Sequence, residues 1–439
     1  MNFQKICIIG LGYIGLPTAS TFAIHGLKVL GVDINPAIIE TLNKGQIHIQ
    51  EPGLRDVVAK AIQSGNFSFS TQPEEADAYI IAVPTPFKED SVGEYEGKKY
   101  KLADMRAVTA AAQAIVPYLH QGNLVVLEST SPPRTTIDLV KPILEKSGLK
   151  AGVDFHLCYS PERVLPGQIL RELVENARVV GGITQESAKA GHDLYASFVK
   201  GEIIETDSTT AEMVKIMENT TRDINIAIAN EFSRLAEKFG VDIWEAISLA
   251  NLHPRINILS PGPGVGGHCI SVDPWFFVEA APELTPLMYN ARLVNDSQPR
   301  FVLEKVKQAL GDLKNKKIAA LGLAYKPDVD DLRESPATEV IHLLQGAGAQ
   351  VKVWEPYKPN AVIFEVKMAA NLESAIQDAE AIVLLVKHTE FKNFNPEEIA
   401  SKTNARILID CVNAWDTFTW RKAGFHVYLL GDNKSRITT

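Results

Sequence analysis

The stretch KICIIGLGYIG, residues 5–15, decides the fold of the first part of this chain. A short β-branched strand runs into Gly10, Gly12 and Gly15, a helical segment follows, and the next strand ends in Asp33. The first glycine permits a tight turn, the second lets the backbone approach a pyrophosphate, and the third lets the helix close on the strand. Asp33 stands about 20 residues on, where a carboxylate accepts hydrogen bonds from an adenosine ribose and repels a 2′-phosphate. The pattern predicts a Rossmann domain that binds NAD rather than NADP.

Strands and helices alternate outward from that motif. The predicted strands KVLGVD, YIIAVPTP, LVVLEST, FHLCYSPE and RVVGGI indicate a doubly wound parallel sheet. A long helix is predicted from Ser208 to about Gly240, a loop rich in Gly and Pro follows at 254–274, and a second α/β pattern begins at Lys316. We therefore expect an α/β protein with two Rossmann-like doubly wound domains, joined by a long central helix and a helical dimerisation domain. The expected boundaries are 1–200, 201–300 and 301–439.

The composition limits the possible partners and compartments. The 439 residues are 46% hydrophobic and 22% charged and carry a net charge of −9, so neither nucleic acid nor an anionic membrane surface is an expected partner. No apolar run approaches the roughly 20 residues that span a bilayer, and the amino end has no signal-peptide pattern, so we expect a cytoplasmic protein. Cys7, Cys158 and Cys411 lie in apolar strand-like segments and are expected in the core. The cysteine spacing predicts no metal site.

Two strand ends and one helix carry further polar residues. Thr85 in VPTP and Thr130 in EST follow predicted strands, at the edge where open α/β sheets bind ligands. Their hydroxyls would contact the cofactor, or would merely cap the next helix. On the long helix, Lys215, Asn219 and Arg222 fall at i, i+4 and i+7 and project from one side. A ligand-facing surface and a solvated polar stripe would both give this spacing.

The segment PGPGVGGHCISVD, residues 261–273, carries the clearest sign of chemistry. Its glycines let the backbone fold tightly around Cys269 and leave the thiol approachable, which a structural cysteine does not require. We therefore predict that Cys269 is a nucleophile. Asp273 lies four residues later and would act on water, order the site, or simply begin a helix. FAD shares the glycine fingerprint, but hydride chemistry with a cysteine favours NAD.

With these motifs in place, the chain resembles the UDP-glucose/GDP-mannose dehydrogenase family over nearly its whole length. The matching segments are GLGYIGLPT with Asp33, VPTPF, ESTSPP, SPERVLPG (160–167), TAEMVK with Asn219 and Arg222, NLHPRINI, PGPGVGGHC and AYKPDVDDLRESP (324–336). The combination of ERVLPG, HPR and GGHC is similar to the branch that acts on N-acetylated sugars. The UDP-glucose branch tends to have an acidic residue where this chain has Pro166.

The resemblance implies roles for individual residues. It implies NAD contacts at Tyr13, Ile14, Asp33, Thr85, Thr130 and Arg333. It implies nucleotide-sugar contacts at Arg163, Val164, Lys215, Asn219, Arg222, His253, Arg255, Gly266, Tyr325 and Lys326, with Arg255 reaching a neighbouring subunit's pocket. Cys269 is then the nucleophile, Lys215 the proton donor and acceptor, and Glu162 the residue that handles water. Val412 stands where relatives commonly have a basic residue, which puts one sugar or phosphate contact in doubt.

The reaction so implied is an NAD-dependent four-electron oxidation of the C6 hydroxyl of a UDP-N-acetylhexosamine to the uronate, through a thioester on Cys269, for surface polysaccharide biosynthesis. UDP-N-acetyl-D-mannosamine is the expected substrate. UDP-N-acetylglucosamine and other UDP-hexoses remain alternatives, because pocket shape reads the configuration at C2. An arginine that acts in trans and a long helix with exposed-looking apolar positions favour a homodimer or a higher homo-oligomer.

Two other classes of function are compatible with parts of the sequence. A two-electron hydroxyacid dehydrogenase shares the first Rossmann domain and the long helix, but it needs neither Cys269 nor a second α/β domain. An NAD-binding regulatory protein would keep the fold without the reaction, although every residue proposed for catalysis is present here.

Overall fold

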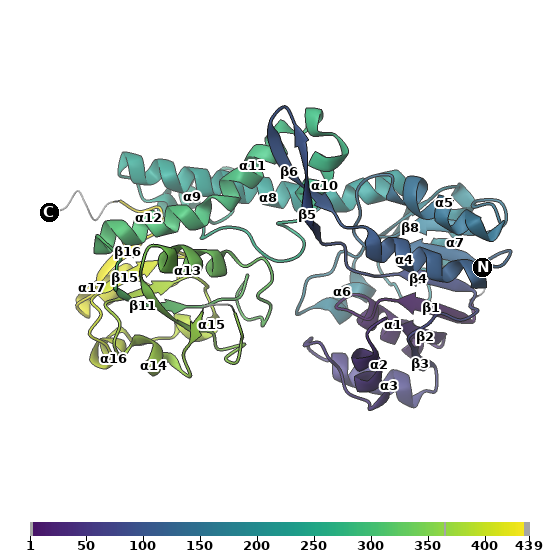
Figure 1. Cartoon of the computed structure of the whole chain (residues 1–439), viewed down its shortest axis with the longest axis horizontal. Coiled ribbons are helices and arrows are strands. Elements are labelled where there is room, and N and C mark those ends of the chain that lie inside the picture. The colour runs from purple at the N-terminus through teal and green to yellow at the C-terminus, as the bar shows by residue number, and fades with distance from the viewer. Residues whose placement is uncertain (1–2, 364–365, 434–439) are drawn as a thin grey trace. The chain divides into compact units, whose positions relative to one another are not determined.

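The computed structural model describes residues 3–363 and 366–433. The chain divides into two compact units: residues 1–218 with 275–284 form the first, and residues 219–274 with 285–439 form the second. Each unit is built on its own α/β sheet (Figure 1).

The sheet of the first unit has eight strands in the order β10-β9-β8-β7-β4-β1-β2-β3. These strands are β1 (Lys5–Ile9), β2 (Lys28–Val32), β3 (Phe67–Ser70), β4 (Ala78–Ile81), β7 (Leu124–Leu127), β8 (His156–Tyr159), β9 (Arg178–Gly182) and β10 (Ile203–Asp207). Neighbouring strands are parallel, as predicted, except that β9 runs antiparallel to β8. The prediction of a wholly parallel sheet is therefore wrong at this pair. Because of the reversal, β9 begins at the edge where β7 and β8 end.

Helices cover both faces of this sheet, because successive side chains of a strand point to opposite sides. Ile6 and Ile8 of β1 pack with α1 and α3, whereas Cys7 and Ile9 pack with α4 and α5. The helices of this unit are α1 (Gly15–Ile24), α2 (Pro36–Asn43), α3 (Leu54–Gln63), α4 (Arg106–Ile115), α5 (Lys141–Leu144), α6 (Ile169–Glu175) and α7 (Gln185–Tyr195), with short helical turns at Val116–Tyr118, Thr136–Val140, Glu145–Ser147 and Pro282–Leu284. This arrangement is the predicted doubly wound fold.

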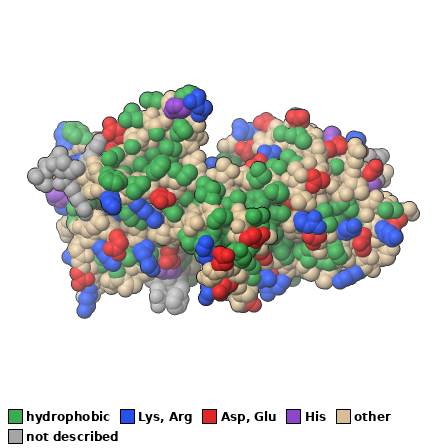
Figure 2. All heavy atoms as spheres, turned by 90° about the horizontal axis from the view of Figure 1, so that it is seen from above, with side chains coloured by type: hydrophobic (Ala, Val, Ile, Leu, Met, Phe, Trp, Pro, Cys, Tyr) green, Lys and Arg blue, Asp and Glu red, His purple; other side chains and the backbone are tan. Residues whose placement is uncertain are grey.

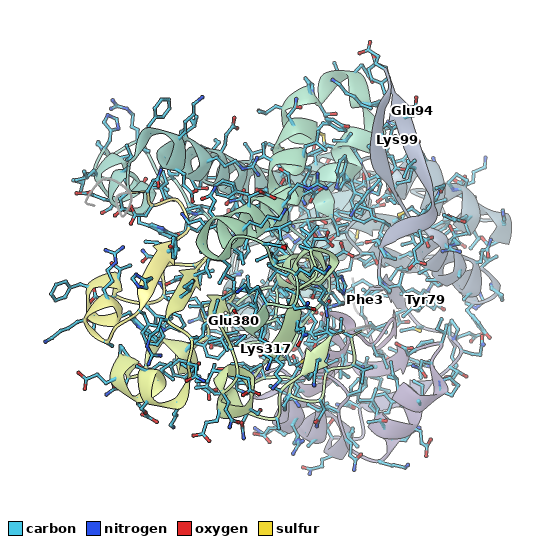
Figure 3. All side chains as sticks on the ribbon, turned by 60° about the vertical axis from the view of Figure 1, so that its left-hand side comes forward. Phe3, Tyr79, Glu94, Lys99, Lys317 and Glu380 are labelled. Atoms are coloured by element: carbon cyan, nitrogen blue, oxygen red, sulfur yellow. The ribbon has the colours of Figure 1, made fainter. Side chains whose placement is uncertain are left out.

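A hairpin of β5 (Phe87–Tyr95) and β6 (Lys98–Ala103) follows the carboxyl end of β4. Glu94 lies opposite Lys99 on the two strands (Figure 3). The backbone N–H of Ala103 donates to Glu279 of α10 (Asp273–Ala280) at 2.8 Å, which ties the base of the hairpin to that helix. The sequence does not predict this hairpin, because charged residues interrupt the alternation of apolar and polar positions.

A helix of 32 residues, α8 (Ser208–Phe239), runs from the first unit into the second and confirms the predicted long helix. In the second unit α8 makes buried polar contacts with α11 (Pro286–Asp296), where Asp223 pairs with Arg292 and Asn230 donates to Asn295 at 2.9 Å. Helix α9 (Ile243–Ala250) begins after Asp242, whose side chain caps it. None of the helices that the structure describes combines the length and apolar character that a bilayer crossing requires.

The sheet of the second unit has six parallel strands in the order β13-β12-β11-β14-β15-β16. They are β11 (Lys317–Leu321), β12 (Gln350–Trp354), β13 (Lys367–Met368), β14 (Ala381–Leu384), β15 (Ile407–Asp410) and β16 (His426–Leu429). Helices α12 (Gln298–Leu310) and α13 (Pro336–Gly346) cover one face, and α14 (Leu372–Ile376), α15 (Thr389–Lys392), α16 (Pro396–Lys402) and α17 (Thr417–Lys422) contribute to the core on the other. The predicted second Rossmann-like domain is confirmed.

The first turn of this second sheet has the geometry of the glycine turn after β1. Gly322 has a φ of +88°, and the backbone N–H of Leu323 donates to Glu355, the acid at the end of the second strand, at 2.7 Å. Ala324 and Pro327 stand where the first sheet has its second and third glycines. The turn is thus preserved without the features that admit a dinucleotide pyrophosphate.

Candidate active site

The glycine turn after β1 has the geometry that a pyrophosphate requires. Gly10 has a φ of +98°, and a Cβ there would lie 2.5 Å from the carbonyl oxygen of Ala82. A Cβ on Gly15 would lie 1.8 Å from the carbonyl oxygen of Gly10, whereas no described heavy atom lies within 4 Å of a Cβ on Gly12. No side chain caps the amino end of α1 at Ile14, which leaves the positive end of the helix dipole to a phosphate. The loop therefore fits NAD.

Asp33 lies half-buried beside this turn, at the end of β2. One carboxylate oxygen accepts from the backbone N–H of Leu11 at 3.1 Å, and the other accepts from that of Asn35 at 2.9 Å. These bonds hold the carboxylate in place, and each oxygen keeps a lone pair for a ribose hydroxyl. Tyr13, predicted to contact NAD, packs partly buried against the core beneath the loop.

The two threonine loops at the sheet edge are joined to each other. The hydroxyl of Thr85 donates to the carbonyl oxygen of Thr130 at 2.7 Å, and the hydroxyl of Ser129 donates to that of Val83 at 2.7 Å. Helix capping is therefore the wrong interpretation of Thr85, because its hydroxyl bonds a neighbouring loop and the chain continues into β5. Both threonines are half-buried at the edge where the cofactor was predicted.

The four cysteines differ in their surroundings. Cys7, Cys158 and Cys411 are buried, as predicted, and burial raises the pKa of Cys7 and of Cys158 to about 12, so these thiols stay protonated. Cys269 is half-buried. A thiol must be reachable to act as a nucleophile, so Cys269 alone among the four meets that condition.

The glycines before Cys269 allow its loop to lie directly against a second predicted ligand segment. A Cβ on Gly266 would lie 2.4 Å from the carbonyl oxygen of Glu334, and one on Gly267 would lie 2.7 Å from the ring of Tyr325. The backbone N–H of Gly267 donates to the carbonyl of Arg333 at 3.1 Å. The second unit thus brings together four predicted site residues, which are Gly266, Cys269, Tyr325 and Arg333.

Helix α10 begins at Asp273, four residues after the cysteine. The Cys269 carbonyl accepts from the backbone N–H groups of Val272 and Asp273 at 3.0 and 2.8 Å. Asp273 is 2% exposed, and its carboxylate accepts a hydrogen bond from the side-chain amide of Asn219 on α8. Asp273 therefore does begin a helix, and it also fixes the orientation of Asn219.

The polar residues of α8 differ in burial. Lys215 is 9% exposed, and none of the described residues forms an ion pair or hydrogen bond with its ammonium group. Residue burial thus separates Lys215 from Arg222, which is exposed to solvent.

The ERVLPG loop follows β8 and is held by side chains of its own unit. Glu162 is buried and pairs with Arg178, 3.0 Å from its Nη1 atom. Arg163 donates to Glu218 of α8, with 3.1 Å between Nε and Oε2. Val164 packs against the apolar core of the sheet. Arg163, predicted to hold the substrate, is thus paired with a carboxylate of α8.

The remaining predicted substrate residues lie in the second unit. His253 and Arg255 are exposed after α9, with 3.4 Å between the Nε2 and Nη2 atoms. The Nζ atom of Lys326 lies 5.8 Å from the centroid of the Tyr325 ring. Val412 packs against the apolar core, so this position offers no charge to a ligand.

Two buried carboxylates that fix the predicted loops were missed in the sequence. Glu51 accepts from the backbone N–H groups of Gly167 and Ile169 at 2.8 and 2.9 Å, which anchors the ERVLPG loop. Glu212 of α8 accepts from the backbone N–H of Thr136 at 2.7 Å, in the segment that follows Thr130. Nothing local distinguishes them from solvated acids. Within the described part of the chain, no group of three or more His, Cys, Asp or Glu side chains is placed to hold a metal ion.

The fold and the loops define a class, the dehydrogenases that bind a dinucleotide on a Rossmann sheet. Residues 4–199 match the NAD binding domain of the UDP-glucose/GDP-mannose dehydrogenase family, residues 209–297 its central domain, and residues 319–417 its UDP binding domain. The chain belongs to this family and is an NAD-dependent oxidoreductase. The match across all three domains favours this family over the two alternatives considered above, a two-electron hydroxyacid dehydrogenase and an NAD-binding regulatory protein.

Individual relatives are similar over nearly the whole chain. A UDP-N-acetyl-D-mannosamine dehydrogenase of Methanocaldococcus jannaschii is 47% identical over 98% of this chain and 97% of its own. An NDP-N-acetyl-D-galactosaminuronic acid dehydrogenase of Ralstonia solanacearum is 46% identical over 94% of this chain and 97% of its own. The solved UDP-D-ManNAc dehydrogenase of Pyrococcus horikoshii superposes with a TM-score of 0.89 at 38% identity, covering 98% of this chain and all of the other.

Proposed function

We propose that this chain oxidises the C6 hydroxyl of a UDP-N-acetylhexosamine to a carboxylate, with two NAD consumed per sugar and UDP-N-acetyl-D-mannosamine as the expected substrate. The observation that carries the proposal is the half-buried Cys269 on a glycine loop laid against Tyr325 and Arg333. The names of the relatives support the choice of sugar. In this proposal residues 1–200 bind NAD, residues 301–439 bind the UDP moiety, and residues 201–300 carry the reacting groups.

The thiol is needed because one site must oxidise the same carbon twice. NAD, when bound, accepts the hydride in each oxidation. Loss of the hydroxyl proton and a hydride turns C6 into an aldehyde, and the Cys269 thiolate then forms a C–S bond to that carbon. Loss of a second hydride from the thiohemiacetal leaves a thioester. Water adds to the thioester carbon, the C–S bond breaks with the electron pair returning to sulfur, and the carboxylate is released.

The predicted polar residues have distinct tasks in this scheme. Lys215 takes the hydroxyl proton. Lys215 and the side-chain amide of Asn219 then stabilise the negative oxygen that forms at C6, and one preorganised donor of this kind typically contributes a few kcal/mol. Asp273 holds the Asn219 amide in the required orientation. Glu162 takes a proton from the water that opens the thioester.

Binding of the two ligands is divided between the sets of residues predicted above. Gly10, Gly12, Tyr13, Ile14, Gly15, Asp33, Thr85, Thr130 and Arg333 hold NAD. Arg163, Val164, Arg222, His253, Arg255, Gly266, Tyr325 and Lys326 hold the nucleotide sugar. Arginine supplies a fork of N–H donors that matches the oxygens of a diphosphate, which an acidic protein must attract locally.

We also propose that the chain works as a homodimer or a higher homo-oligomer. Apolar side chains gather on the surface over α8 and α9 (Figure 2). Phe239 of α8, Leu249 of α9 and Leu252, which follows α9, are 69, 60 and 77% exposed. Contiguous apolar surface of this kind marks protein interfaces. Phe239→Glu should shift the sedimentation coefficient to that of a monomer. Mixing inactive Arg255→Ala and Cys269→Ser subunits should restore part of the activity if Arg255 serves the partner's site.

A panel of UDP-sugars with NAD tests the reaction. UDP-N-acetylmannosamine, UDP-N-acetylglucosamine, UDP-N-acetylgalactosamine and UDP-glucose are incubated separately, and NADH is counted at 340 nm per sugar consumed. We expect two NADH per UDP-N-acetylmannosamine, with the lowest KM of the four. The galactosamine sugar is included because of the relative from Ralstonia solanacearum. One NADH per sugar, or turnover of UDP-glucose alone, would contradict the proposal.

A further inference from the structure

A buried cluster of charges lies at the carboxyl edge of the first sheet, and Glu162 alone among its members has a part in the reaction as written above. Glu128 follows β7, Glu162 follows β8, and Arg178 begins β9. The antiparallel register of β8 and β9 pairs Cys158 with Gly182 and therefore brings Arg178 opposite the loop of Glu162. The side chains of Arg178 and Glu128 are 5% and 0% exposed, and that of Glu162 is 7% exposed.

One guanidinium binds both carboxylates. Nη1 of Arg178 lies 3.0 Å from Glu162, Nη2 donates to Glu128, and Nε donates to the hydroxyl of Ser160 at 2.9 Å. The guanidinium carbon lies 3.7 Å from the ring centroid of Tyr195, and the Tyr195 hydroxyl donates to the same oxygen of Glu128 at 3.0 Å. Arg178 can move only if all of these contacts break, so it fixes where the Glu162 carboxylate points.

The cluster has one cation for two buried acids. The second carboxylate oxygen of Glu128, Oε2, is buried and has no hydrogen-bond partner among the described residues. A proton on Glu128 would reside on this oxygen. Burial raises the pKa of Glu128 to about 7, against the opposing charge of Arg178. The other titratable groups facing Glu128 are Glu162 and Tyr195. Cys158 interacts with Tyr195 and Arg178, and burial holds both Tyr195 and Cys158 protonated at neutral pH.

We propose that Arg178 is a positioning residue for Glu162, and that Glu128, by losing or keeping its proton, sets how strongly Glu162 takes a proton from the attacking water. The inference rests on the proposed thioester hydrolysis. When Glu128 is neutral, Arg178 balances Glu162 alone. When Glu128 ionises, Arg178 is shared between two negative charges, which favours transfer of the water proton to Glu162. Hydrolysis should therefore accelerate as the pH rises through the range in which Glu128 ionises.

The test measures the lifetime of the acyl group on Cys269 rather than overall turnover. Wild-type enzyme is mixed with NAD and UDP-N-acetylmannosamine at pH values from 6 to 9 and quenched in acid at successive times. Mass spectrometry of the intact protein then gives the fraction that carries the adduct. The wild-type rate of adduct loss should rise across this range. Glu128→Gln, which mimics the protonated acid and should fold, is expected to give a rate with little pH dependence. Arg178→Lys should lower the rate at least tenfold at every pH without changing the KM for NAD.

Ser160→Ala is the matched control, because it removes a buried partner of Arg178 and touches neither carboxylate. It should lower the melting temperature and leave the slope of rate against pH unchanged. If Glu162→Gln prolongs the adduct while Glu128→Gln keeps the wild-type slope, the inference is wrong and the proposed function stands. If acid forms with no adduct in any variant, the thioester route itself is wrong.

Discussion

Removing the negative charge of Asp33 should weaken NAD binding and leave the fold intact. Asp33→Asn is nearly isosteric and keeps one oxygen, so it retains one of the two backbone bonds from Leu11 and Asn35. It loses the charge that strengthens hydrogen bonds to the ribose hydroxyls, and a hydrogen bond to a charged group contributes about 1.5 to 3 kcal/mol. Because 1.4 kcal/mol is a factor of ten, the Kd for NAD should rise about 10- to 150-fold.

Calorimetric titration with NAD is the direct assay, and two controls make it specific. Asp56→Asn on α3 removes the same charge from an exposed position of the same unit, and it should leave the NAD affinity unchanged. UDP should bind Asp33→Asn as tightly as wild type, because the UDP binding domain lies at residues 319–417. The ratio of NADP to NAD affinity should rise as well, since the carboxylate no longer repels a 2′-phosphate. An NAD Kd within twofold of wild type would refute this account of the loop.

Cys269→Ser should bind NAD normally and form no acid, which titration and chromatography of the products would show; wild-type turnover by this variant would exclude the covalent route. Arg255→Ala should remain folded and raise the Kd for the nucleotide sugar about tenfold or more, and an unchanged Kd would place the pocket elsewhere. Burial raises the pKa of Glu212 from 4.5 to about 7, so between these values the folded state holds a proton that the unfolded state has lost. Between pH 5 and 8, the free energy of unfolding of the wild type, measured with urea, should therefore fall by up to about 3 kcal/mol relative to that of Glu212→Gln. If the difference between the two proteins stays constant over this range, the assignment is wrong.

Both sheets could be predicted from the sequence because each buried strand is a short β-branched run next to a turn. Strand direction could not, since the alternation of side chains is the same in a parallel and an antiparallel strand. That is why β9 was expected to be parallel to its neighbours. The direction of β9 matters for the site, because the antiparallel pairing with β8 brings Arg178 to the ligand edge of the sheet.

The candidate site was predictable where one segment carries the signal. Gly10, Gly15, Gly266 and Gly267 stand at positions where a Cβ would collide with backbone or ring atoms, and the sequence marks them directly. Contacts between segments that are far apart in the chain leave no comparable pattern in the sequence. Glu128, Glu162 and Arg178 are separated by up to 50 residues, and only the fold reveals that they share one buried cluster. Arg163 was predicted to hold substrate, and nothing local indicated its pairing with Glu218.

The most direct measurement is the mass of the Cys269 peptide after rapid acid quenching during turnover. Wild-type enzyme supplied with NAD and UDP-N-acetylmannosamine should yield this peptide with the added mass of a uronyl nucleotide sugar, and hydroxylamine should remove it. The amount should fall to zero when the sugar is exhausted. Formation of the uronate at full rate with an unmodified Cys269 at every time point would contradict the central claim.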